Sequence, residues 1–197
     1  MSASKRKIER ADILAPKVYA AERKERRTAM MPLKRLRRVE VGPYCTFYFE
    51  NYETMWLQIH EMLHIEKGGD EQIEDELRAY NPLIPQGSDL VATVMFEIDD
   101  EVRRNAVLLK LTGVEEKMYF EVGGERVKSD PEHDVERTAE DGKTSSVHFL
   151  HFRFSPAQIA KFRDPSVPVI LGVDHPAYAH MTRLSPETRA SLARDFA

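Results

Sequence analysis

The chain has 197 residues, of which 42% are hydrophobic, and a formal net charge of −4. This length and composition suit one globular domain with a hydrophobic core and exclude disorder of the whole chain. The single cysteine, Cys45, excludes an internal disulfide and any metal site built from several cysteines of one chain. The N-terminus has no apolar signal core, and no stretch approaches the roughly eighteen apolar residues of a membrane span. We therefore expect a cytoplasmic protein with no membrane partner.

Positive charge is concentrated at the start of the chain. Residues 1–38 contain 13 Lys and Arg against 4 Asp and Glu, a net charge of +9, which leaves −13 for the remainder. We predict a basic N-terminal helical arm at 1–38 that belongs to the same unit as a single α+β domain at 39–197. The two opposite charges should attract each other.

Helices are predicted from caps and from apolar residues at three- and four-residue steps. Residues 12–31 look helical but have a thin apolar stripe, and Pro32 should end that helix. The strongest helix runs from Tyr52 to about Glu66, with an apolar stripe that includes Met55, Ile59 and Leu63. Capping residues, glycines and prolines predict further helices at 70–80, from Asp99 to 111, from Ser155 to about 162, and after Ser185.

Strands are predicted from β-branched and aromatic runs between these helices. Gly123 and Gly124 indicate a hairpin, and the polar, acidic segment 128–144 should be a surface excursion. Strand-like runs outnumber βαβ alternations, so we predict an α+β fold with a mainly antiparallel sheet and helices packed on it. The runs lie at 44–50, 90–98, 117–122, 125–127, 147–154, 167–173 and 177–184.

One short motif suggests a metal-dependent hydrolase. His60-Glu61-Met62-Leu63-His64 fits the zincin pattern H-E-x-x-H, in which two histidines on one helix face bind zinc and the glutamate activates water. A third ligand is hard to find, because the metzincin extension has Lys67 where glycine is required, although Asp70 stands at the ligand position. The ordinary alternative is a pair of solvated histidines flanking the helix core, and we favour it.

A second group of histidines lies on predicted strands. Alternation places His148 at the edge of a core face of its strand, whereas His151 lies on the opposite face. The strand that ends at Asp174 and His175 turns at a proline and returns past His180. Carboxylates and imidazoles at strand ends often form sites, so these residues are candidates for binding a ligand or a transition metal, iron or zinc. A local turn and hydrogen-bonded core histidines are the alternatives.

Five stretches together resemble one known family. They are RRVEVGPYCTFYFEN (37–51), QIHEML (58–63), AYNPLIPQGSDLVAT (79–93), SSVHFLHFRF (145–154) and LGVDHPAYAH (171–180). On these residues the chain is similar to the bacterial family catalogued as domain of unknown function 3501. The resemblance spans nearly the whole chain. His148, Asp174, His175 and His180 match the family pattern, whereas the pair His60 and His64 departs from it.

The resemblance implies a function without assigning catalytic residues. Genes of this family are often found beside those of rubrerythrin-type iron proteins and iron–sulfur oxidoreductases, which points to iron and peroxide metabolism. Three functions follow for testing. They are an accessory protein whose basic arm binds a rubrerythrin-type or iron–sulfur partner, an H-E-x-x-H hydrolase, and a nucleic-acid-binding protein. Interleaved acidic residues and a lone Tyr19 argue against nucleic acid. Catalysis and homo-oligomerisation are left open.

Overall fold

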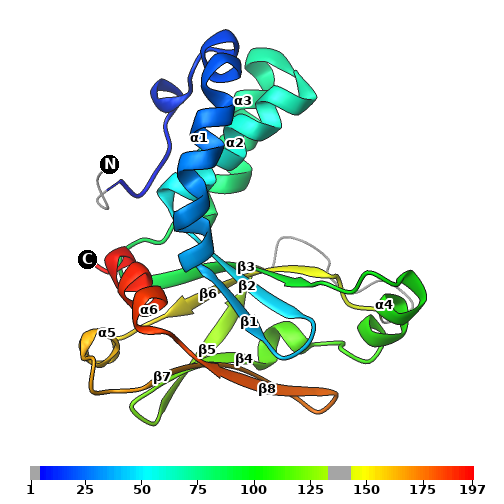
Figure 1. Cartoon of the computed structure of the whole chain (residues 1–197), viewed down its shortest axis with the longest axis vertical. Coiled ribbons are helices and arrows are strands. Elements are labelled where there is room, and N and C mark those ends of the chain that lie inside the picture. Colours follow the sequence, from blue (N-terminus) through cyan, green and yellow to red (C-terminus); the bar gives the residue numbers. More distant parts are fainter. Residues whose placement is uncertain (1–4, 133–142) are drawn as a thin grey trace.

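The computed structural model describes residues 5–132 and 143–197 as an antiparallel sheet carrying an upright layer of helices (Figure 1). Eight strands form one sheet in the order β1-β2-β3-β6-β5-β4-β7-β8. The strands are β1 (Arg38–Val41), β2 (Cys45–Glu50), β3 (Asp89–Phe96), β4 (Met118–Val122), β5 (Glu125–Pro131), β6 (Val147–Arg153), β7 (Val169–His175) and β8 (Tyr178–Arg183). The predicted α+β class and antiparallel sheet are confirmed. Most of the predicted excursion at 128–144 lies outside the described residues.

The sheet curves until its two end strands meet. Tyr178 of β8 donates its hydroxyl to the Val41 carbonyl of β1 at 2.8 Å, and Thr182 donates to the Glu40 carbonyl at 2.8 Å. Gly42 turns the chain below them with a positive φ of 71°, and a side chain there would collide with His180 and Tyr178. The nearly closed sheet surrounds an aromatic core that includes Phe47, Phe120 and Phe152.

The helices form two groups. Helices α1 (Pro16–Leu36), α2 (Tyr52–Glu66) and α3 (Gly69–Tyr80) form the upright layer, and α4 (Glu101–Leu108), α5 (Pro156–Arg163) and α6 (Pro186–Leu192) border the sheet. Asn51 caps α2 and Ser155 caps α5, both in capping boxes. No helix in the described ranges combines the length and apolar character needed to cross a membrane.

The prediction that Pro32 ends the first helix is wrong, because α1 continues to Leu36. Pro32 lies on the exposed side of α1, where water can replace the hydrogen bond that its missing N–H group would have donated. The N-terminal segment also does not project as an arm. It packs along α2, and Arg10 forms ion pairs with Asp70 at 3.0 Å and with Glu74 at 3.2 Å.

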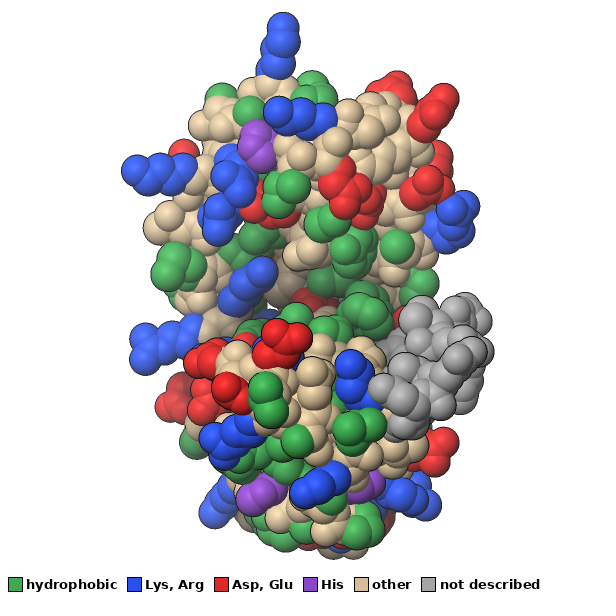
Figure 2. Space-filling model, turned by 90° about the vertical axis from the view of Figure 1, so that its right-hand side faces the viewer, with side chains coloured by type: hydrophobic (Ala, Val, Ile, Leu, Met, Phe, Trp, Pro, Cys, Tyr) green, Lys and Arg blue, Asp and Glu red, His purple; other side chains and the backbone are tan. Residues whose placement is uncertain are grey.

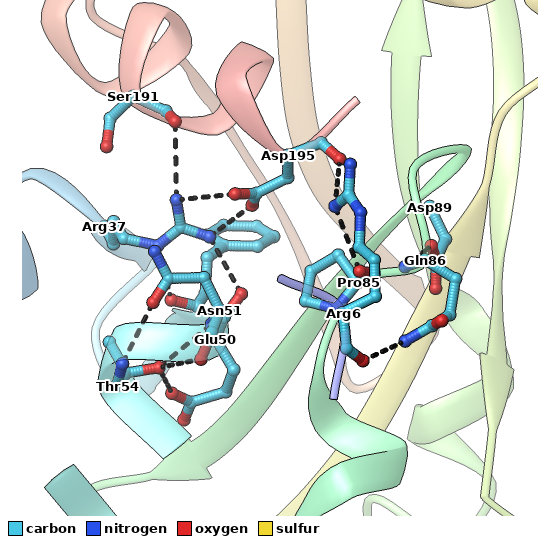
Figure 3. A network of polar contacts seen from close by, with 11 residues as sticks. Arg6, Arg37, Glu50, Asn51, Thr54, Pro85, Gln86, Asp89, Ser191 and Asp195 are labelled. Atoms are coloured by element: carbon cyan, nitrogen blue, oxygen red, sulfur yellow. Dashed lines mark hydrogen bonds and ion pairs between the residues drawn. The ribbon is translucent and has the colours of Figure 1, made fainter. Parts of the chain in front are cut away.

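A buried arginine fixes the point where the helical layer stands on the sheet. Arg37, between α1 and β1, is 2% exposed and donates to the carbonyls of Phe49 and Glu50 at 2.8 Å each (Figure 3). Its guanidinium also pairs with the carboxylate of Asp195, which lies 158 residues further along the chain. Arg37 therefore holds the end of α1, the end of β2 and the C-terminal segment together.

We predict that Arg37→Met lowers the free energy of unfolding by about 3–5 kcal/mol, because it leaves the buried Asp195 carboxylate without its cation. Urea unfolding followed by circular dichroism measures this loss. The control is Arg126→Met, which breaks the exposed ion pair between Arg126 and Asp174 and should change stability little. A similar loss in both variants would contradict the assigned role of Arg37.

Candidate functional site

The H-E-x-x-H motif lies on α2 where α1 covers it, so His60 is buried at 2% exposure. Our prediction of two solvated histidines is therefore wrong for His60, because a second helix packs on the flank that we expected to face solvent. The His60 Nε2 atom accepts the Leu14 N–H at 3.0 Å, which places the ring proton on Nδ1, 2.7 Å from the Trp56 carbonyl. Burial lowers the pKa of His60 and keeps the ring neutral. Both ring nitrogens are thus engaged within the fold.

The Glu61 carboxylate of α2 likewise binds side chains of α1. Arg23 binds its two oxygens at 2.8 Å each, and Tyr19 donates its hydroxyl at 2.6 Å. Hydrogen bonds from Arg23, followed by the one from Tyr19, lower the pKa of the Glu61 carboxyl to about 2. A general base that activates water at neutral pH needs a pKa nearer 7. In this environment Glu61 is a structural anion.

A zinc measurement tests this structural interpretation of the motif. Because His60 can bind a metal only by giving up its hydrogen bond with Leu14 or the one with Trp56, we predict that His64→Ala does not change the zinc content of protein purified without chelator. Elemental analysis of the wild type and the variant gives the answer. A stoichiometric zinc ion that is lost in His64→Ala would restore the hydrolase hypothesis.

The four strand residues that we proposed as a ligand site do not converge. His148 lies fully buried on the inner face of β6, with Nε2 2.9 Å from the Ser145 carbonyl, as its alternation with Leu150 predicts. Asp174 pairs with Arg126 at 2.8 Å on the outside, and the Arg126 guanidinium lies over the Tyr119 ring. Across residues 5–132 and 143–197, no three His, Cys, Asp or Glu side chains form a group that could hold a metal ion.

The two histidines of the last hairpin contact both the hairpin and more distant segments: His175 Nε2 lies 3.3 Å from the Thr112 carbonyl, and His180 lies against Gly42. His175 pairs with Tyr178 across the β7–β8 turn, and its Nδ1 atom accepts the Ala177 N–H at 3.2 Å. His180 pairs with Val173 two residues further along and packs against the Tyr178 ring at 4.5 Å between centroids. In this hairpin the Asp174 carboxylate pairs with Arg126, and His175 accepts a backbone N–H of the turn.

Sequence reasoning did not select His151, which is held between two carboxylates. Its Nδ1 atom lies 3.4 Å from Asp89 and its Nε2 atom lies 3.5 Å from Glu132. These two contacts, with Asp89 contributing most, raise the pKa of His151 to about 9. The neighbours in sequence gave no signal, because Asp89 comes from β3, which pairs with β6 only in the folded sheet.

The His151 cluster should make stability depend on pH. A histidine whose pKa rises from 6.5 to about 9 on folding stabilises the fold fully below pH 6.5, and the contribution is lost as the pH rises through 9. We predict a loss of about 1–2 kcal/mol between pH 6.5 and 9.5 after allowance for solvent screening. Urea unfolding across this range should show the slope in the wild type and in His180→Gln. His151→Gln should flatten it, and an unchanged slope in that variant would be the contrary result.

Helix α1 carries a cationic face on the side opposite its contact with Glu61. We call this the α1 face and define it by Lys17, Ala21, Lys24, Thr28 and Met31, which lie opposite the buried Tyr19 at 100° per residue. Neither lysine forms an ion pair within the described residues. Met31 is 67% exposed. The opposite side of α1 is fixed by Tyr19 and Arg23.

A groove lies at the foot of the helical layer, between α1, α2 and α3 and the outer face of the sheet. Figure 2 shows this face hollowed at mid-height, with hydrophobic side chains around the hollow. The groove has a volume of about 480 Å³. Its lining combines four kinds of group: cations at the α1 end, the carboxylate of Glu50, hydroxyl and amide side chains, and apolar or aromatic side chains of β2, β3, β6, α2 and α3.

Comparison with known proteins places the chain in a family. The model of the family described as "protein of unknown function (DUF3501)" matches residues 7–196. The chain belongs to the DUF3501 family. The resemblance noted in the sequence is thereby confirmed at the level of the family. No curated protein matches the chain.

A solved structure shares the fold of this DUF3501 protein. It is the crystal structure of a protein of unknown function from Burkholderia pseudomallei K96243, with 38% sequence identity and a TM-score of 0.89. The match covers 96% of this chain and 99% of the other. The helical layer and the curved sheet are therefore shared with this relative as one unit.

Proposed function

We propose that this DUF3501 protein is a cytoplasmic accessory protein that docks on an acidic surface of a partner through the α1 face. The supporting observation is the asymmetry of α1. One side is held on the body by contacts to Glu61, and the other carries the exposed Met31 together with Lys17 and Lys24, which form no ion pair among residues 5–132 and 143–197. Methionine is enriched in protein interfaces, and the charge of the two lysines would speed encounter with an acidic surface through long-range attraction.

The partner belongs, in this proposal, to an iron-dependent redox module, as a rubrerythrin-type or iron–sulfur protein. The family resemblance supports this choice through the neighbouring genes. The proposed function needs no metal in this chain, because the partner would hold the iron. The net charge of −13 outside residues 1–38 restricts contact with an acidic partner to the basic helix.

The two alternatives have less support from the geometry. A hydrolase would have to free His60 and Glu61 from five hydrogen bonds within the fold. Nucleic-acid binding commonly adds aromatic stacking to positive charge, and the only aromatic residue of α1, Tyr19, faces the body.

A binding measurement with matched charge variants tests docking. We predict that a purified rubrerythrin-type or iron–sulfur partner binds the wild type in low salt, and that Lys17→Glu/Lys24→Glu lowers the affinity about tenfold or more. Raising the salt to 0.1 M, where the Debye length is about 10 Å, should weaken the wild-type complex. Surface plasmon resonance with the partner immobilised gives both values.

The control for this test is Lys110→Glu/Lys117→Glu, which makes the same change in net charge at exposed positions away from α1. It should bind nearly as tightly as the wild type. Equal loss in both double variants would show general charge repulsion and contradict docking through the α1 face. The absence of any complex at low salt with either partner class would remove the proposed function. Size-exclusion chromatography of the chain alone shows whether self-association competes with the partner.

A further inference from the structure

The groove at the foot of the helical layer contains a buried carboxylate that folding alone does not explain. Glu50, at the end of β2, is 9% exposed. Its Oε1 atom accepts the Thr93 hydroxyl at 2.8 Å, and its Oε2 atom accepts the Thr54 hydroxyl at 2.6 Å. Glu50 forms no ion pair within the described ranges, since Arg37 binds only its backbone carbonyl. A buried charge without a cation destabilises a fold, so its presence calls for another role.

The carboxylate has acceptor capacity to spare in the direction of the groove. An ionised carboxylate offers about four lone-pair sites, and the two threonine hydroxyls occupy two of them. Thr54, Thr93 and Glu50 all line the groove. A ligand there that carries an N–H or O–H group would complete the hydrogen bonding of Glu50.

The walls around Glu50 are apolar and aromatic. Met55 and Leu83 line the helical side, and Tyr48, Met95 and Phe149 line the sheet side. The side chains on the sheet side come from adjacent strands, because Tyr48 pairs with Thr93 and Thr93 pairs with Phe149. A flat aromatic body matches such a surface. The volume of about 480 Å³ is within the range of roughly 300–1,000 Å³ of small-molecule sites.

Free cations stand at the α1 end of the same groove. Lys34 and Arg35, in the last turn of α1, line the groove and form no ion pair within the part of the chain that the structure describes. Arg38 lies beside them and is already paired with Glu40 at 3.0 Å. The α1 end of the groove therefore favours an anionic group of a bound ligand. In a ligand that extends along the groove, this group lies at one end and the group that contacts Glu50 lies at the other.

From these contacts we infer that the groove is a binding site for a small amphiphilic acid. The ligand has a flat apolar body, an anionic group for Lys34 and Arg35, and an N–H or O–H donor for Glu50. A neutral hydrocarbon would leave Glu50 at one end of the groove and the cations Lys34 and Arg35 at the other without partners. An inorganic anion would leave the apolar walls uncovered. This site is separate from the α1 face, so it extends the proposed function without depending on it.

The probe for this site is anilinonaphthalene sulfonate, which combines aromatic rings, an N–H group and an anion, and fluoresces in apolar surroundings. We predict saturable binding of one equivalent to the folded wild type. Lys34→Glu/Arg35→Glu should lower the affinity about tenfold or more, the effect of losing a charge-assisted hydrogen bond. The uncharged phenylnaphthylamine keeps the fused rings and the N–H group, and its binding should change little in that variant.

Two further variants complete the experiment. Glu50→Gln keeps the size of the side chain and should weaken both probes, because both donate an N–H group to this position. Lys17→Glu/Lys24→Glu makes the same change in charge outside the groove and should bind both probes like the wild type. Matching thermal unfolding midpoints show that each variant is folded.

Three results would overturn the inference. They are no saturable binding to the wild type, equal loss of the sulfonate probe in the two double charge variants, and loss only in Lys17→Glu/Lys24→Glu. The last result would place the probe in the second cavity, of about 380 Å³, which Lys17, His60 and His64 line. None of these results involves the protein partner, so the docking proposal stands or falls separately.

Discussion

The burial of the Arg37 guanidinium is the constraint on which the rest of this structure depends. An arginine that loses nearly all contact with water must replace that water with carbonyl oxygens and a carboxylate. Arg37 finds them on β2, on α6 and on the C-terminal segment. These partners come from segments that lie far apart in the sequence. All hydrogen bonds of the guanidinium therefore form only when the helical layer stands at one position on the sheet. The groove beside Glu50 is a consequence of that position.

The same layer explains why a catalytic sequence pattern has a structural role here. In α2, the side that carries His60 and Glu61 receives α1: His60 Nε2 accepts the N–H of Leu14 just before α1, and the Glu61 carboxylate binds Tyr19 and Arg23 of α1. Glu61 holds Arg23 in place, and this leaves the opposite side of α1 free to present its cations. The motif thus contributes to the proposed function by positioning α1.

Local features of the fold were predictable from the sequence, and contacts between distant segments were not. The α2 boundaries, the Gly123-Gly124 hairpin and the inward position of His148 follow from caps, turn residues and alternation, which are properties of neighbouring residues. The pair of Arg37 and Asp195 depends on a separation of 158 residues. Glu50 could not be identified from the sequence for the same reason. Its carboxylate accepts hydrogen bonds from Thr54 and from Thr93, and Thr93 comes close only in the folded chain.

The central claim is that the meeting of helices and sheet, and not the histidine motif, forms the binding site of this DUF3501 protein. Nuclear magnetic resonance of isotope-labelled methionine methyl groups tests it most directly, because Met55 and Met95 line the groove, whereas Met181 is exposed on β8. Titration with anilinonaphthalene sulfonate should shift the Met55 and Met95 signals along one saturable curve and leave Met181 in place. Shifts at Met62 within the motif, with Met55 and Met95 unmoved, would contradict the account.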